Sequence, residues 1–207
     1  MSQEPLSFSD DMTGSILRGF FKDGELDSIR LEGMATTMYH IFEDSIYQGN
    51  NRASGDTIVL KFGEDDLESI FISGGSEGTY TPDSLGSDID GKVVYQSDKI
   101  KYNMQDESTD LLGEANIDYT DMNLKAGFIN VAWRSNLLKA LPSSDKDSTI
   151  TPFRPTMIEE GNEPMVGDTM IYNLDSQNGK VIRGKTKADD GYYHGKEIRN
   201  QSMDIFY

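Results

Sequence analysis

The sequence predicts an all-β protein, a solenoid-like stack of short antiparallel strands. The clearest evidence is the segment from Gly167 to Ile198, where Met170, Tyr172 and Leu174 alternate with other residues. This spacing is typical of a strand, because successive side chains of a strand point to opposite faces. A turn ending in Asn178-Gly179 follows, and a second apolar run begins at Val181. Strand, turn and strand predict a β-hairpin.

The same unit recurs earlier in the chain. Asp56, Asp98 and Asp168 each precede apolar residues at the second, fourth and sixth following positions. A further copy appears when the sequence is shifted by 41 positions, which places Gly14 on Gly55 and Gly33 on Gly74. A repeat of roughly 40 residues is typical of arrays in which each unit covers the apolar face of its neighbour.

The first two units fill the chain up to Tyr80. Two or three short strands are expected over residues 16–39, broken by a turn at residues 22–24, where Gly24 tolerates a positive φ. A short helix over 36–46 is an alternative, because the apolar spacing there also fits a helix. Residues 50–55 are predicted to form a turn into the second unit.

The third unit has the longest strand-like run. A loop is expected at residues 81–87, strands at 93–95 and 115–119, a turn at 120–123, and a strand of up to ten residues over 124–133. Residues 140–166 then contain four prolines. Proline cannot donate to a strand ladder, so this stretch is predicted to be a loop or an edge segment. The predicted organisation is repeats over 1–140, a proline-rich loop over 141–166, and a further, truncated repeat over 167–207.

Composition narrows the possible functions. The chain has 207 residues, 36% of them apolar, which is enough for one large or two ordinary folded domains. A net charge of −17 disfavours nucleic acid and anionic membrane surfaces as partners. There is no cysteine, so disulfides and thiolate metal sites are excluded. The sequence shows no signal peptide and no apolar stretch long enough for a spanning helix, and both ends look cut from a longer array.

The motifs resemble the OstA-like domains of the LptA and LptD group of lipopolysaccharide transport proteins. We expect the chain to be a fragment of an LptD-like protein. The resemblance rests on the Gly-Asp-x-x-x-Tyr-Asn motif at 167–173, the Gly-Tyr-x-His-Gly motif at 191–195, and residues 119–133, which end in Trp133. It covers the chain from about Gly14 to the end. The resemblance implies a periplasmic β-jellyroll, associated with the outer membrane, that shields the acyl chains of lipopolysaccharide in an apolar groove. It also implies docking with other jellyroll proteins by edge strands. The membrane barrel of the larger family member is not present in this sequence.

The alternating apolar residues of each unit are the candidates for a lipid groove, although an ordinary dry core would show the same pattern. The candidate set is Ile58, Leu60, Phe62, Ile70, Ile72, Ile100, Tyr102, Ile117, Tyr119, Met170 and Tyr172.

The polar motifs indicate structural roles. We interpret the recurring Asp56, Asp98 and Asp168 as turn formers whose carboxylates accept backbone N–H bonds. Residues 88–91 resemble part of a calcium loop but lack its oxygen spacing and closing Glu, so no metal site is predicted. Only two histidines occur, and no catalytic motif or cofactor site is found, so we expect a protein that is not an enzyme.

The leading hypothesis is therefore a periplasmic lipid-binding jellyroll that conducts lipopolysaccharide toward the outer membrane. One alternative is a structural or adhesive β-solenoid with a dry core and an acidic face that binds a partner. Another is a carbohydrate-active β-helix enzyme, which would need a carboxylate cluster on one face. An interior that is open along its length favours lipid transport, whereas a filled core favours the structural alternative.

Overall fold

The structure is a computed structural model that describes residues 8–63, 66–143, 153–188, 191–201 and 205–206. Within these ranges the chain forms one antiparallel sheet of 15 strands and a single turn of 3₁₀ helix, Trp133–Ser135. The prediction of an all-β fold is confirmed. None of the helical structure in the described part of the chain could cross a bilayer.

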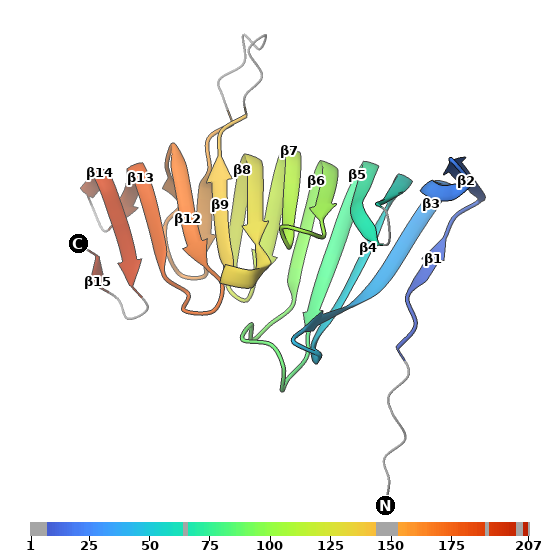
Figure 1. Ribbon diagram of the computed structural model, residues 1–207. Helices are drawn as coiled ribbons and strands as arrows, with labels where there is room; N and C mark the ends of the chain where they lie inside the picture. The colour runs from blue at the N-terminus through green and yellow to red at the C-terminus, as the bar shows by residue number, and fades with distance from the viewer. Residues whose placement is uncertain (1–7, 64–65, 144–152, 189–190, 202–204, 207) are drawn as a thin grey trace, which may run out of the picture.

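The strands follow one another along the sheet, mostly as hairpins (Figure 1). Its first half contains β1 (Asp11–Thr13), β2 (Ile16–Lys22), β3 (Glu25–Glu43), β4 (Ile46–Phe62), β5 (Leu67–Pro82), β6 (Val93–Asn103) and β7 (Ser108–Tyr119). Its second half contains β8 (Met122–Ala132), β9 (Leu137–Leu141), β10 (Thr156–Glu159), β11 (Met165–Val166), β12 (Thr169–Asn173), β13 (Gly179–Ala188), β14 (Gly191–Gln201) and β15 (Ile205–Phe206).

Several strands are much longer than the sequence suggested. The predicted turn at residues 50–55 is wrong, because β4 runs through it from Ile46 to Phe62. The alternative helix over 36–46 is also wrong: β3 continues to Glu43 and a tight turn leads directly into β4. Other turns lie close to their predicted positions: residues 23–24 for the turn expected at 22–24, 83–92 for the loop expected at 81–87, and 120–121 for the turn expected at 120–123. Residues 174–178 separate β12 from β13, where a turn was also expected. Each of these long strands bends near its middle, so its two halves belong to two different layers of the molecule.

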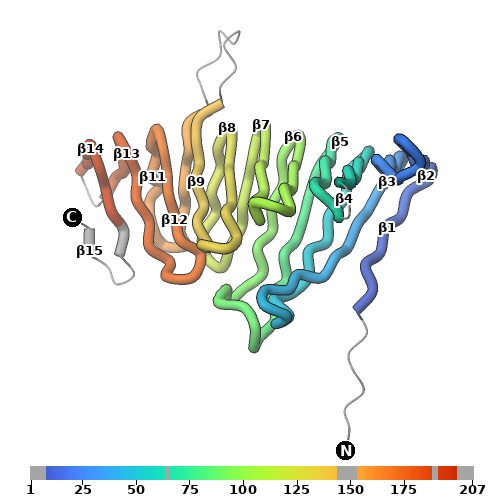
Figure 2. Tube along the Cα trace, in the orientation of Figure 1, coloured from blue at the N-terminus to red at the C-terminus, as the bar shows by residue number. Residues whose placement is uncertain are grey.

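A corner divides the long strands into two arms. The pairing register shifts at Glu32/Ala35 between β3 and β4, at Ser54/Thr57 between β4 and β5, and at Leu112/Ala115 between β7 and β8. Residues with positive φ lie at these shifts, including Gly33, Gly74 and Gly113. An unpaired residue in a ladder bends the strand, and a glycine adopts positive φ without steric cost. The Cα trace turns back at this corner along the upper edge of Figure 2.

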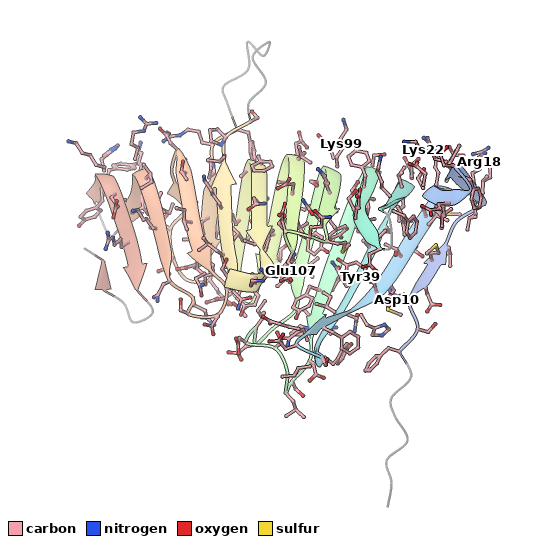
Figure 3. The ribbon with its side chains drawn as sticks, in the orientation of Figure 1. Asp10, Arg18, Lys22, Tyr39, Lys99 and Glu107 are labelled. Carbon is pink, nitrogen blue, oxygen red and sulfur yellow. The ribbon has the colours of Figure 1, made fainter. Side chains whose placement is uncertain are left out.

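We call the two layers arm A and arm B. Arm A contains β2, β9, β12 and residues 25–32, 57–62, 67–73, 99–112, 128–132, 179–182 and 197–201. Arm B contains β1, β10, β11 and residues 35–54, 76–97, 115–126, 185–188 and 191–195. In Figure 3, Lys99 lies near the corner at the upper edge of the sheet, whereas Glu107 lies toward the lower edge, in the turn between β6 and β7 at the tip of arm A.

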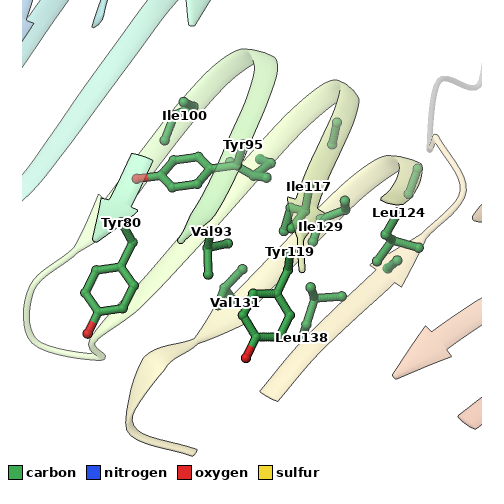
Figure 4. Close-up of a cluster of buried hydrophobic side chains, with 14 of the residues drawn as sticks. Tyr80, Val93, Tyr95, Ile100, Ile117, Tyr119, Leu124, Ile129, Val131 and Leu138 are labelled. Atoms are coloured by element: carbon green, nitrogen blue, oxygen red, sulfur yellow. The ribbon is translucent and has the colours of Figure 1, made fainter. Parts of the chain in front are cut away.

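Two of the strands lie in the stretch predicted to be a proline-rich loop. β10 pairs with β8, and β11 pairs with β10 and β13, so this stretch continues arm B. Residues 144–152 of that prediction lie outside the described residues. One apolar core lies between the two arms and includes residues from Leu31 to Ile198. Figure 4 shows part of it, with Val93, Tyr95, Ile117 and Tyr119 from arm B, and Ile100, Ile129, Val131 and Leu138 from arm A.

Candidate functional site

The eleven predicted groove residues all belong to the interior between the arms. Ten of them are at most 4% exposed and lie in one core cluster, and Phe62 is half-buried and packs against that cluster. Nine come from arm A, and Ile117 and Tyr119 come from arm B. The structure therefore brings the whole set together, on the face that points inward. Their contact with a lipid stays a prediction.

Sequence reasoning missed most of the arm B side of the interior. Tyr95 is 2% exposed and alternates with the buried Val93, a signal that the period of two could have revealed. Asn51 is 1% exposed, but it stands in the Asn-rich stretch that resembled a turn. Tyr39, Tyr80 and Trp133 complete an aromatic lining. Trp133 ends the motif at 119–133, but no sequence pattern indicated that these three rings would lie together.

A buried polar network crosses the interior. The hydroxyl of Tyr95 donates to Oδ1 of Asn51 at 2.5 Å, and Nδ2 of Asn51 donates to the hydroxyl of Tyr39 at 2.9 Å. The hydroxyl oxygens of Tyr95 and Tyr102 lie 2.8 Å apart. Since Tyr95 gives its proton to Asn51, Tyr102 is the donor in that pair. We call these four residues the tyrosine network.

Burial sets the acid–base properties of the network. It raises the pKa of Tyr95 far above the ordinary value of a phenol, and it raises the pKa of Tyr39 and of Tyr102 in the same direction. The cause is that an ionised phenolate loses its hydration inside the protein. The network therefore consists of neutral hydroxyls at physiological pH.

Small residues make room for the network on arm B. Gly78 pairs with Tyr95 across β5 and β6. A Cβ at Gly78 would lie 2.6 Å from the hydroxyl oxygen of Tyr95, so the ring lies directly over this glycine. Ala53, the next residue across the sheet, is 2% exposed. The Tyr95 side chain can cross β5 to reach Asn51 on β4 because these positions are small.

A cavity of about 360 Å³ opens between the tips of the arms, and we call it the mouth cavity. Its aromatic walls contain Tyr39 and Tyr80 from arm B, and Tyr102 and Trp133 from arm A. The rings of Tyr80 and Trp133 lie 5.1 Å apart, and Nε1 of Trp133 donates to Oγ1 of Thr109 at 2.8 Å. The cavity therefore has a fixed apolar wall below a polar rim.

Charged residues form the rim of the mouth cavity. Arg134 pairs with Glu107 at 2.5 Å, and Glu43 and Asp88 also line the opening. Glu107 raises the pKa of Arg134, so the guanidinium stays charged. An opening with an aromatic wall and a charged rim suits an amphipathic ligand whose apolar part enters the protein.

A second cavity, of about 680 Å³, lies at the C-terminal end of the interior, and we call it the end cavity. Met157, Met165 and Ile198 are its buried apolar lining, and Tyr193 and His194 are exposed at its edge. Methionine adapts to irregular apolar shapes, so this lining can repack around a guest.

The three recurring aspartates lie at the corner. Asp56 and Asp98 stand inside β4 and β6, so they mark bends within strands and not the turns that were predicted. Asp56 packs against Gly74, and Asp98 packs against Gly113. Asp168 forms ion pairs with Arg154, at 2.6 Å, and with Arg183. Arg183 has a φ of +50° and takes the place that Gly74 and Gly113 occupy in their strands. Their roles are therefore packing and ion pairing at the corner.

Both ends of the sheet are edge strands. At the N-terminal end, β1 and β2 each pair only with β3 within the described part of the sheet. Exposed apolar side chains gather on β1 and β2, namely Met12, Ile16, Leu17, Phe20 and Phe21. Such an edge offers unpaired backbone groups and apolar surface to another strand.

Comparison with known proteins agrees with this architecture. No protein-family model and no curated protein matches the chain. A solved structure that does match is LptH from Pseudomonas aeruginosa, the LptA-homologous periplasmic component of the lipopolysaccharide transport device. The match has a TM-score of 0.57 and 12% sequence identity, and it covers 73% of this chain and 95% of LptH. The chain therefore has the β-jellyroll fold of the LptA-like proteins.

Proposed function

We propose that this chain is a periplasmic lipid-binding module that conducts lipopolysaccharide toward the outer membrane. The observation that carries the proposal is the interior: apolar side chains from both arms face it, and the mouth cavity and the end cavity open into it. The fold that the chain shares with LptH also supports a role in lipopolysaccharide transport. Apolar lipid tails gain about 25 cal/mol for each Å² removed from water, so an enclosed apolar interior is a physical means of carrying them.

The proposed path begins in the cavities. The candidate groove residues pack against one another, so lipid chains enter at the mouth cavity or the end cavity and displace side chains as they go deeper. The methionine side chains that line both cavities can change conformation to admit them. The proposed module is a carrier and not an enzyme, and it uses no cofactor.

A second candidate function is a structural β-solenoid with a dry core. It is favoured by the low exposure of the ten buried groove residues, which would suit a core with no guest. Under this alternative the acidic surface binds a partner, and the cavities are incidental.

Site-specific photo-crosslinking to lipopolysaccharide distinguishes these functions. A photoreactive residue replaces Leu60, Tyr102 or Tyr172 on the inward face, and Met104 in the mouth cavity. The exposed Lys61 and Lys101, which are neighbours on the same strands, serve as opposite-face controls, together with Ile171. Adducts confined to the inward positions support lipid transport. A folded protein with no inward adduct favours the structural alternative.

The partners proposed are other jellyroll proteins of lipopolysaccharide transport, docked by strand addition at the edges of the sheet. The exposed β1 and β2 are the proposed docking strands at the N-terminal end. Replacing Leu17 and Phe21 by lysine should weaken binding to such a purified partner, because it places charge on the apolar edge. The same replacements at the exposed Leu85 and Ile158, far from this edge, should leave binding unchanged.

A further inference from the structure

We infer that the tyrosine network is a latch that holds the two arms closed and sets how deep a lipid chain can enter. The inference rests on the proposed function for its biological meaning. The closing of the arms is a separate physical property, and it can be measured without lipid.

The link between the arms is the pair Tyr95 and Tyr102. These residues lie on the same strand, β6, seven positions apart. In a straight strand they would be about 23 Å apart, at about 3.3 Å for each residue. Their hydroxyl oxygens lie 2.8 Å apart, because β6 folds back at the corner and Tyr102 reaches across from arm A. The other two bonds of the network join residues of arm B.

The network lies between the mouth cavity and the deeper aliphatic core. Tyr39 and Tyr102 line the mouth cavity. Tyr102 pairs with Ile70, whereas the next inward pair, Ile72 and Ile100, lies two residues closer to the corner. A chain that enters from the mouth therefore meets the network before it reaches the fully buried isoleucines. The ring of Tyr39 also contacts that of Tyr102 edge to face, at 5.9 Å, which adds to the barrier.

The chemistry of the network suits a reversible closure. Every buried side-chain nitrogen and oxygen in the described residues has a hydrogen-bond partner. A fully satisfied buried network favours one arrangement of the groups around it, and a partly broken one is costly. When the arms part, water or the hydroxyl and carbonyl groups of a lipid can bond the exposed phenols. Around β6, closed and open arms are then two discrete states, and the Tyr95–Tyr102 bond favours the closed one.

The chain is well suited to a direct measurement, because it has no cysteine. Ile46→Cys at the tip of arm B and Gln105→Cys at the tip of arm A, both at exposed positions, accept spin labels. Electron–electron resonance then gives the distribution of distances between the tips. Tyr102→Phe, which removes one oxygen atom, should raise the ratio of open to closed arms about fivefold, the effect of one typical hydrogen bond.

A matched control is Tyr80→Phe. Its hydroxyl donates to the backbone oxygen of Gln48 at 2.8 Å and lies 3.1 Å from Oγ of Ser87, both in arm B. The Tyr80→Phe variant loses a buried hydroxyl without losing a link between the arms, so its distribution of tip-to-tip distances should match that of the parent. Tyr95→Phe breaks the link from its other side and should widen the distribution as Tyr102→Phe does. Circular dichroism on the same samples reports folding.

The outcomes separate the latch from the proposed function. Identical distributions for the parent, Tyr102→Phe and Tyr95→Phe would overturn the latch, whatever the protein binds. A wider distribution in both variants, and not in Tyr80→Phe, establishes it. Photo-crosslinking of lipopolysaccharide at Ile72, below the network, should then be stronger in Tyr102→Phe. A wider distribution of tip-to-tip distances without any lipid crosslink would count against lipid transport but would still support the latch.

Discussion

The side chain of Asp56 lies against the Cα of Gly74, so that a Cβ at Gly74 would be 2.7 Å from the Cβ of Asp56. Asp56 belongs to β4 and Gly74 to β5, and both are at the corner where the register shifts. This contact explains why a glycine stands next to a recurring aspartate, in addition to its φ of +81°.

We predict that Gly74→Ala destabilises the protein by about 2–4 kcal/mol, since it combines an unfavourable φ with overpacking. Gly75→Ala is the control, because Gly75 also has positive φ, at +60°, but a Cβ there would meet no atom within 4 Å. It should cost roughly 1–2 kcal/mol. Urea unfolding measures both. Equal losses for the two variants would show that the contact with Asp56 does not matter.

We predict that Gly78→Ala displaces the ring of Tyr95 and costs about 1–3 kcal/mol, because the added methyl group has no free space. Gly19→Ala on β2 is the control, since its nearest neighbour would be at an ordinary 3.5 Å. Urea unfolding gives the free energies, and the tip-to-tip distance distribution should widen in Gly78→Ala. A Gly78→Ala protein as stable as Gly19→Ala would contradict the close packing.

Tyr119→Phe should lower the free energy of unfolding by about 1–2 kcal/mol. Its hydroxyl donates at 2.9 Å to the backbone oxygen of Leu174, and both residues are at most 1% exposed, so the change removes a buried hydrogen bond from that carbonyl. Tyr192→Phe, at a position 68% exposed, should change stability by less than about 0.5 kcal/mol. The two free energies come from the same urea titrations, and a neutral Tyr119→Phe would be the contrary result.

Stability should fall at alkaline pH. The pKa values of Tyr39, Tyr95 and Tyr102 are raised in the folded state, so folding favours the neutral phenols. Their contribution is complete below the unfolded pKa of about 10 and is lost as pH rises toward the folded values. Each buried tyrosine should then reduce the free energy of unfolding by about 1.4 kcal/mol for each pH unit above 10.

Urea unfolding between about pH 8 and about pH 11 tests this dependence. Tyr102→Phe should show a shallower decline than the parent, because it has one fewer buried phenol to ionise. Parallel declines in the two proteins would indicate that the alkaline loss comes from other groups.

The period of two in the sequence predicted the inward face of arm A well. Ile58, Leu60, Ile70 and Ile72 follow strict alternation, and they are buried because alternate residues of a strand share a face. Arm B was harder. Asn51 is polar and follows Asn50, so local chemistry indicated a turn, but the hydroxyls of Tyr39 and Tyr95 satisfy its amide in the interior.

The corner could not be read from periodicity. A bend at Gly74 keeps the strand pairing on both sides, so it leaves the alternation of apolar residues nearly intact. The contact between Tyr95 and Tyr102 depends on that bend, because it joins residues that a straight strand would separate. The glycines and aspartates of the repeat were visible in the sequence. Their function as a bend, and not as an end of the strand, required the tertiary structure.

The bend in each long strand has a mechanical consequence. Since β3, β4, β5, β6 and β7 each pass through both arms, each carries its own hinge at the corner. The two arms are therefore not rigid plates that turn about one common axis. We expect the opening to travel along the molecule, widening at one strand while its distant neighbours stay closed, so that a guest could move lengthwise without full exposure of the core.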